Sequence, residues 1–191
     1  MVNSEAWIER WRAGDERAAE AIYNHYRNGL FRLAYVLLGD REDAEEVMQD
    51  ALNYALVNIH RYRPEQASFK TWLNTIAVSR CRDRQRRKLL PRLSLTAWLR
   101  QGHDVADPAL RPEQNATVNE THHEIWQAVQ ALKPALREAI YLRHWADHTY
   151  QEIGAILGCP IPTAQSRVKQ AHETLRNYLL EKAGEGVASY E

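Results

Sequence analysis

The sequence predicts an all-α protein with two small helical domains joined by a flexible linker. Apolar residues recur at helical spacing through long parts of the 191-residue chain, and no stretch shows the alternation and hairpin turns typical of β-strands. Glycine and proline are few, with 8 and 7 residues. Three of the prolines interrupt residues 89–119, which have no sustained periodicity. This length allows one large domain or two small ones, and the interruption favours two.

Residues 1–88 are predicted to form four helices around one shared core. Three polar side chains are suitable N-caps for the first three helices: Ser4, Asp15 and Asp40. These helices are expected to end near Gly14, Gly39 and His60. A loop over residues 61–68 then precedes a fourth helix, expected over residues 69–87.

The third predicted helix has one apolar face and a narrow polar stripe on the opposite face. Its apolar residues follow the i, i+3, i+4 rule from Ala44 to Ile59. The polar stripe consists of Glu46, Gln49, Asp50 and Asn53. Such a stripe indicates either a partner surface or an ordinary solvated face.

Charge is unevenly distributed, although the formal net charge is zero. Residues 38–50 contain six acidic residues and one basic residue, whereas residues 79–88 contain six basic residues and one acidic residue. The two opposed patches predict two different partners, one basic and one anionic. A net charge of about +5 in the second patch favours a phosphate-facing surface over a merely solvated helix face.

The middle of the chain, residues 89–119, is predicted to be the linker. Its apolar residues, among them Leu95 and Trp98, are unusual for a pure spacer, so a short docking helix is an alternative there. A second helical unit is expected over residues 120–183. Residues 184–191 are expected to be a frayed tail.

Residues 150–171, with the sequence YQEIGAILGCPIPTAQSRVKQA, predict a helix-turn-helix. Gly158 ends the first helix because glycine adopts left-handed backbone angles at little cost, and Pro160 prevents its continuation. The second helix buries residues such as Ala164 and Val168. Its exposed side chains are Thr163, Gln165, Ser166, Arg167, Lys169 and Gln170. Such a helix can enter a DNA major groove, and the alternative is a helical hairpin in an ordinary bundle.

Several other functions are not expected. No apolar run is long enough to span a bilayer, and the first residues are not typical of a signal peptide, so we expect a cytoplasmic protein without membrane insertion. Cys81 and Cys159 match no metal-ligand spacing and are expected to be free thiols. His144 and His148 lie one helical turn apart, but no third ligand accompanies them. No catalytic constellation is present, so neither enzymatic activity nor a cofactor is expected.

Three segments together resemble the bacterial sigma factors of the extracytoplasmic-function (ECF) type, in the sigma-70 family. The segments are LGDREDAEEVMQDAL, SFKTWLNTIAVSRCRDRQRRK and LKPALREAIYLRHWADHTYQEIGAILGCPIPTAQSRVKQAHETLR, at residues 38–52, 68–88 and 132–176. The resemblance implies that residues 1–88 form a domain similar to sigma domain 2, and that residues 120–183 form one similar to sigma domain 4. It also implies binding to core RNA polymerase, recognition of −10 and −35 promoter elements, and help in melting the −10 region.

The resemblance also implies roles for particular residues. Glu46, Gln49 and Asp50 are expected to dock on the clamp coiled coil of the polymerase β′ subunit, and the β flap is the second expected polymerase contact. The residues expected to contact −10 DNA are Phe69, Trp72, Ser79, Arg80, Arg84, Arg86, Arg87 and Lys88, with a core position as the alternative for Trp72. The residues expected to contact −35 DNA are the six exposed ones of the second helix, Thr163, Gln165, Ser166, Arg167, Lys169 and Gln170. An anti-sigma factor is a further expected partner.

The chain departs from the family pattern at several positions. Ser79 stands where the family often has asparagine, which affects the −10 base preference. Gln165 and Gln170 stand at or near positions that are usually basic, which predicts an adenine contact in the −35 element and a weaker salt dependence. Gly154 replaces a usual alanine, at a cost of up to about 1 kcal/mol of helix stability, and predicts a less rigid unit.

Two other classes of protein remain as alternatives. A stand-alone helix-turn-helix regulator would bind operators as a dimer without polymerase, and it would leave the two charged patches unexplained. A helical adaptor would bind protein but not DNA.

Overall fold

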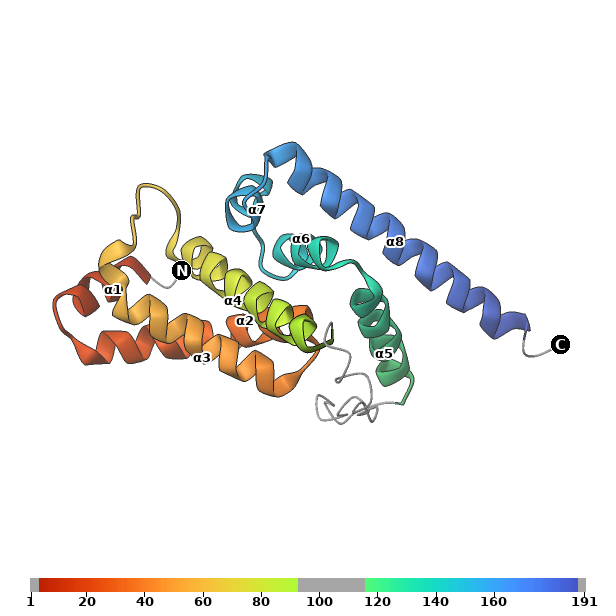
Figure 1. Ribbon diagram of the computed structural model, residues 1–191, viewed down its shortest axis with the longest axis horizontal. Helices are drawn as coiled ribbons and strands as arrows, with labels where there is room; N and C mark the ends of the chain where they lie inside the picture. The colour runs from red at the N-terminus through yellow and green to blue at the C-terminus, as the bar shows by residue number, and fades with distance from the viewer. Residues whose placement is uncertain (1–3, 93–115, 189–191) are drawn as a thin grey trace.

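The computed structural model describes residues 4–92 and 116–188, with side chains over 4–88 and 123–182. Within these residues the chain forms eight α-helices, one short 3-10 helix and no strand (Figure 1). The expected all-α class is therefore confirmed. None of the described helices combines the length and the apolar character needed to cross a membrane.

The N-terminal unit contains four α-helices. They are α1 (Ser4–Arg12), α2 (Glu16–Leu38), α3 (Arg41–Val57) and α4 (Phe69–Arg92), with a 3-10 helix, η1 (Ile59–Arg61), after α3. Two of the expected caps are confirmed, because Asp15 accepts a hydrogen bond from the backbone N–H of Arg17 and Asp40 accepts one from that of Asp43. Ser4 is itself the first residue of α1 rather than its cap.

The C-terminal unit contains the other four helices. They are α5 (Ala116–Ala131), α6 (Pro134–His144), α7 (Tyr150–Leu157) and α8 (Ile161–Ala188). Gly158 ends α7 with φ 66° and ψ 43°, the left-handed conformation that the sequence predicts. A capping box that was not predicted begins α7, in which Thr149 and Glu152 bond each other's backbone N–H groups.

The helices are longer than predicted at three points. The last turn of α4, to Arg92, and the first turn of α5, from Ala116, both lie inside the predicted linker. The rest of that segment, residues 93–115 with Leu95 and Trp98, lies outside the described residues. At the other end of the chain, α8 continues to Ala188 through most of the predicted tail.

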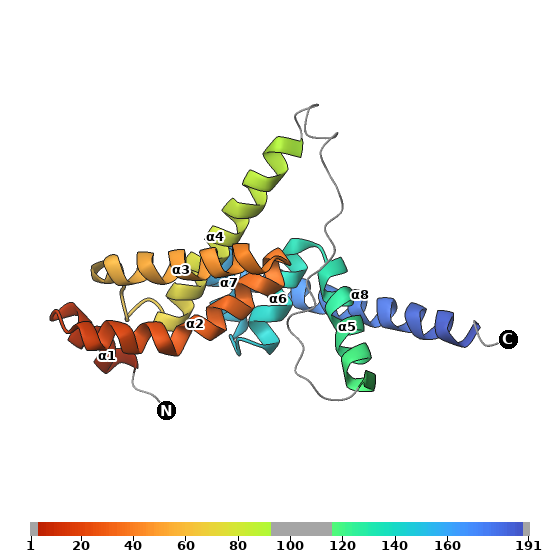
Figure 2. The ribbon, with the colours of Figure 1, turned by 90° about the horizontal axis from the view of Figure 1, so that it is seen from below.

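The two units pack against each other and share one hydrophobic core. This core includes Leu33, Leu52 and Leu73 of the N-terminal unit as well as Leu142 and Ile153 of the C-terminal unit, and each of these is at most 1% exposed. The contacts between the units include those of α4 with α7, those of the C-terminal half of α2 with α5 and α6, and the pair between Arg82 of α4 and Glu138 of α6 (Figure 1). In both views, the distal part of α8 extends away from this packed body (Figure 2).

Candidate polymerase and nucleic-acid interface

The polar stripe on α3 lies on the surface, and the opposite face of the helix is buried. Glu46, Gln49 and Asp50 are all exposed. Glu46 also accepts a hydrogen bond of 3.0 Å from Arg84 of α4, and a second nitrogen of the same guanidinium lies 2.6 Å from its other carboxylate oxygen. One end of the stripe is therefore partly neutralised by the neighbouring helix, whereas the Asp50 carboxylate is not held by Arg84.

Asp43 lies at the junction of α3 and α4 and is buried. Arg84 donates to its Oδ1 at 2.8 Å, and Lys88 contacts its Oδ2. Burial opposes ionisation of Asp43, but the hydrogen bonds from Lys88 and Arg84 outweigh it and lower the pKa of this carboxyl. The acidic and basic patches, which the sequence predicted to face two different partners, therefore meet and pair along one edge.

The other basic residues of α4 point in different directions, because residues 80–88 cover more than two helical turns. Arg80 lies over the ring of Tyr54, with its guanidinium carbon 5.3 Å from the ring centroid. Arg82 makes a bidentate pair with Glu138 of α6. Arg86 pairs with Asp83, one turn earlier.

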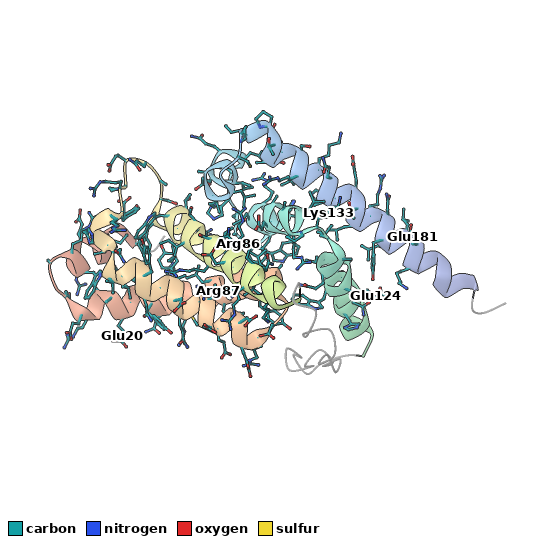
Figure 3. The ribbon with its side chains drawn as sticks, in the orientation of Figure 1. Glu20, Arg86, Arg87, Glu124, Lys133 and Glu181 are labelled. Atoms are coloured by element: carbon teal, nitrogen blue, oxygen red, sulfur yellow. The ribbon has the colours of Figure 1, made fainter. Side chains whose placement is uncertain are left out.

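The predicted single phosphate-facing patch is therefore divided. Of its six basic residues, four make ion pairs and one stacks on a ring, while Arg87 is exposed. Arg86 and Arg87 both lie on the C-terminal half of α4 (Figure 3), which projects away from the other helices in Figure 2. Ser79 is exposed about two turns before Arg86, and it lies beside an open hollow lined by Arg82, Gln85 and Arg86.

The two aromatic residues expected to contact −10 DNA differ in exposure. Phe69 is only 2% exposed, and it packs edge-on against Tyr26 and Tyr62, with ring centroids 5.3 Å apart in both pairs. In this structure Phe69 is a core residue, contrary to the expectation of a DNA contact. Trp72 is half-buried above it, with the two centroids 5.7 Å apart, so that one aromatic ring supports the other.

The polar face of α8 is presented as the helix-turn-helix predicts. Gln165, Ser166, Lys169 and Gln170 are exposed, while Thr163 and Arg167 are half-buried. Gln170 donates to the Ser166 hydroxyl at 3.0 Å, and Lys169 lies 3.9 Å from Glu173. Ala164 and Val168 are buried on the opposite face, which fixes the rotation of the helix.

The turn between α7 and α8 explains why position 154 is a glycine. The backbone N–H of Cys159 donates to the Gly154 carbonyl at 2.9 Å. A Cβ at Gly154 would lie 2.8 Å from the backbone oxygen of Cys159, which is closer than real Cβ contacts. The glycine thus permits a tight turn, and the expectation of a less rigid unit is not supported.

The histidines and cysteines do not form a metal site in the part of the chain that the structure describes. His144 faces His172 of α8, with the two Nε2 atoms 2.8 Å apart, whereas His148 is buried against Asn74 of α4. No group of three or more potential metal ligands occurs among these residues. Cys81 and Cys159 are free, and burial raises the pKa of the Cys81 thiol to about 12.

The sequence reasoning missed the polar contacts that join the two units. The side chain of Thr71 donates to Glu152 at 2.8 Å, and the amide of Asn74 lies 2.7 Å from Nε2 of His148. Lys70 also donates to the Ala146 carbonyl at 2.6 Å. The one available signal was Asn74, a polar residue at a position that continues the apolar face of a helix.

Comparisons with known proteins match both units. Residues 22–89 match Sigma-70 region 2, and residues 122–175 match Sigma-70 region 4. The ECF RNA polymerase sigma factor SigW of Bacillus subtilis is 29% identical over 177 residues, which cover 90% of this chain and 94% of that protein. The ECF RNA polymerase sigma-E factor of Escherichia coli K12 is 29% identical over 186 residues, which cover 93% of this chain and 94% of that one.

Solved structures show the same fold. The sigma factor RpoE of Bartonella quintana, solved with the anti-sigma factor NepR, has a TM-score of 0.68 at 24% identity, and the match covers 84% of this chain and 95% of that one. CnrH, solved with the cytosolic domain of CnrY, has a TM-score of 0.66 at 18% identity, with 91% and 95% covered. With regions 2 and 4 in the same order and over almost the full length of its relatives, this chain belongs to the sigma-70 family, as a sigma factor of the ECF type.

Proposed function

We propose that this promoter-directing sigma factor binds core RNA polymerase, recognises the −10 and −35 elements of its promoters and helps to melt the −10 region. The main support for the proposal is the presence of both region 2 and region 4 in one chain. Each region has an exposed polar surface on the helix where the sequence predicts it, α3 in the first and α8 in the second. It acts in the cytoplasm, where the polymerase is found. It needs no cofactor, since the chemistry belongs to the polymerase.

The α3 stripe is the proposed docking surface for the β′ clamp coiled coil. An exposed acidic surface complements a basic partner, and it acts chiefly on orientation and on the rate of encounter. Asp50 and Gln49 carry this role most directly, because Glu46 is also engaged with Arg84. The β flap is proposed to contact the C-terminal unit.

The −10 element is proposed to meet the outer surface of α4. Trp72 offers a ring for stacking against an unpaired base, and Phe69 supports this ring from the core. Ser79 lies beside the open hollow. The basic side chains are proposed to contact the phosphate backbone of the DNA. Such contacts fix the position of the protein on the DNA without reading its sequence. These side chains are Arg80, Arg84, Arg86, Arg87 and Lys88.

The −35 element is proposed to meet the exposed face of α8. Gln165 and Gln170 both present amide groups there. An amide can pair with the adenine edge in the major groove, whereas arginine favours guanine. We therefore expect Gln165→Arg to shift the preferred base at one −35 position from adenine toward guanine, and an unchanged preference would remove this assignment.

An anti-sigma factor is a proposed partner as well. The Bartonella sigma factor, whose fold this chain shares, was solved in complex with one. Such a partner would cover the surfaces proposed here for polymerase and DNA.

The proposed function is tested by transcription with purified components. The protein is mixed with bacterial core RNA polymerase and fragmented genomic DNA of its source, and the 5′ ends of the transcripts are sequenced. We expect starts that share two spaced upstream motifs and that are lost with Asp50→Lys. The matched control is Glu20→Lys, a reversal of the same charge on an exposed residue of α2.

Two results would contradict the proposal. Starts that persist with Asp50→Lys would remove the α3 stripe from polymerase binding. An absence of protein-dependent starts, together with tight binding to operator-like DNA without polymerase, would favour the stand-alone regulator.

A further inference from the structure

Helix α1 precedes the part of the chain that matches region 2, which begins at residue 22. It lies beside η1, where the chain leaves α3 and enters the loop before α4 (Figure 1). This loop, residues 62–68, leads directly to the surface of α4 that is proposed to meet the −10 element. The location of α1 therefore makes it a candidate support for that surface.

Two side chains of α1 donate hydrogen bonds to backbone carbonyls at the exit from α3. The indole Nε1 of Trp11 donates to the Leu56 carbonyl at 2.9 Å. Nη2 of Arg12 donates to the carbonyls of Tyr62 at 2.7 Å and of Ile59 at 3.3 Å. Leu56 is one of the last four residues of α3, whose carbonyls have no partner inside the helix, and a cation close to such an end is favourable. These bonds therefore fix the path of the chain from α3 into the loop.

The rings of Tyr62, Phe69 and Trp72 contact one another, and we call these three residues the aromatic trio. The centroid of the Tyr62 ring lies 5.3 Å from that of Phe69 and 5.5 Å from that of Trp72. Tyr62 begins the loop and Phe69 follows its last residue, so their contact closes the loop at its base. Both are buried, at 3% and 2% exposed, whereas Trp72 is half-buried. Trp72 is thus the member that reaches the surface, and the other two support it.

Arg12 joins α1 to the aromatic trio. Besides bonding the Tyr62 carbonyl, it lies over the ring of Tyr62, with its guanidinium carbon 5.7 Å from the ring centroid. A ring that must meet a ligand in one orientation needs its own position locked by packing and hydrogen bonds. Arg12 is itself exposed, so its replacement removes these contacts without opening the core.

We infer that Arg12 and Trp11 are positioning residues for the reading of the −10 element, and that they act through Tyr62 on Trp72. They hold the end of α3 and the start of the loop, so that Trp72 meets an unpaired base in one orientation. The inference rests on the proposed function, because it takes Trp72 as the stacking surface for that base. It gives α1 a part in promoter selectivity, separate from the polymerase docking proposed for α3.

Two variants of α1 and a matched control test the inference. Arg12→Ala removes both carbonyl bonds and the contact with the Tyr62 ring, and Trp11→Phe removes the indole N–H but keeps an aromatic ring. Arg10→Ala is the matched control, because Arg10 is an exposed arginine of the same helix that pairs with Asp15, the N-cap of α2. Arg12→Lys keeps the charge but loses the forked guanidinium that reaches two carbonyls.

The quantity measured is selectivity for the −10 strand. Holoenzyme formed with each variant is titrated with a forked probe, made from a promoter identified by 5′-end sequencing, in which one strand of the −10 region is unpaired. A second probe differs by one base in that region, and the ratio of the two affinities is the selectivity. A variant that only folds less well lowers both affinities equally and leaves this ratio unchanged. The affinity of each variant for core polymerase is measured alongside.

We expect Arg12→Ala to lower the selectivity about fivefold, against the roughly tenfold or more that one wrong base pair costs. Trp11→Phe should lower it about twofold, as for the loss of one hydrogen bond, and Arg12→Lys should lie between wild type and Arg12→Ala. Arg10→Ala should keep the wild-type ratio, and no variant should change the affinity for core polymerase. In a Trp72→Ala background, Arg12→Ala should have no further effect, because residues that act through one contact are not additive.

Hydrogen exchange of the free protein tests the anchoring without DNA or polymerase. We expect faster exchange over residues 59–68 in Arg12→Ala and no change there in Arg10→Ala, because anchored backbone opens less often. Unchanged exchange in a folded Arg12→Ala variant would overturn the anchoring on which the inference depends.

Failure of the inference and failure of the proposed function give different results. If wild-type holoenzyme prefers the native strand and Arg12→Ala has the same selectivity, the inference is overturned and the proposed function stands. An equal loss with Arg10→Ala, or an undiminished loss in the Trp72→Ala background, would overturn the inference as well. If the wild type binds core polymerase but shows no preference between the two strands, the proposed reading of the −10 element is wrong, and the inference fails with it.

Discussion

The two helices proposed to contact DNA are held in place by different interactions. On α4, basic residues are engaged by carboxylates of two other helices, with Arg82 bound to Glu138 of α6 and Arg84 bound to both Asp43 and Glu46 of α3. On α8, the polar face is largely exposed, and the helix is fixed by small residues behind it, of which Ala164 is fully buried. One of these two helices is therefore positioned by charge and the other by close packing.

The difference shows that a count of charges along the sequence does not account for charges that are paired within the protein. The net charge of about +5 in residues 79–88 overstates the positive surface available to phosphate, because much of it is neutralised within the protein. The polar face of α8 carries fewer charges, but they are not buried in ion pairs.

The largest expected effect comes from removing the buried carboxylate beneath α4. Asp43→Ala leaves Arg84 and Lys88 without their shared partner, so we expect the free energy of unfolding to fall by about 3 kcal/mol. Urea denaturation at pH 7 measures it. Glu45→Ala, which removes an exposed partner of Arg41, should cost at most about 0.5 kcal/mol. Equal losses in the two variants would contradict positioning by buried charge.

A single methyl group should disturb the packing that positions α8. Gly154→Ala is expected to destabilise the protein by about 1–2 kcal/mol, because the new Cβ would meet the Cys159 carbonyl. Gly29→Ala is the control, since Gly29 lies inside α2 and, apart from the neighbouring backbone of this helix, nothing lies within 4 Å of the added Cβ. There the helix propensity of alanine should stabilise by up to about 1 kcal/mol. Thermal unfolding of both variants is the measurement, and a stabilised Gly154→Ala would contradict the tight turn.

Acid should weaken the junction of α4 with α7 through Glu152. Burial opposes ionisation of Glu152, but hydrogen bonds from Thr149 and Thr71 outweigh it and lower its pKa to about 2. Because the folded pKa lies below the ordinary value of 4.5, the stabilisation is present above pH 4.5 and is lost as the pH falls from there toward 2. Urea denaturation over this range should show a smaller pH dependence for Glu152→Gln than for wild type. Identical slopes would exclude Glu152 as a source of acid sensitivity.

The smallest effect concerns the salt dependence of promoter binding. Replacing an exposed phosphate contact should reduce the slope of log affinity against log salt by about 1, so we expect this for Arg87→Gln and Lys169→Gln. Arg84→Gln should reduce the slope by less, because Arg84 already neutralises Asp43 and Glu46. Binding of labelled promoter DNA to the holoenzyme at several salt concentrations provides the values. Equal slopes for Arg84→Gln and Arg87→Gln would show that the ion pairs open on DNA.

Local signals in the sequence determined the helices and the faces they expose. Asp15, Asp40 and Gly158 act as the caps that their chemistry predicts, because capping depends on neighbouring backbone groups alone. The exposed stripe of α3 and the exposed face of α8 follow from helical periodicity for the same reason. The ends of α4, α5 and α8 were less predictable, since nothing in the nearby residues forces a helix to stop there.

Only the tertiary structure decided how these surfaces combine. The burial of Phe69 and the pairing of Arg84 with Asp43 depend on atoms brought together from distant parts of the chain. The contact between Asn74 and His148 joins residues 74 positions apart, and no periodicity in the sequence encodes such a pairing. The sequence by itself determined the helices of the two units and the polar faces of α3 and α8, because those features are local. The way the two units pack together was decided by hydrophobic packing, by hydrogen bonds and by the Arg82–Glu138 ion pair between them, which form only once both units have folded.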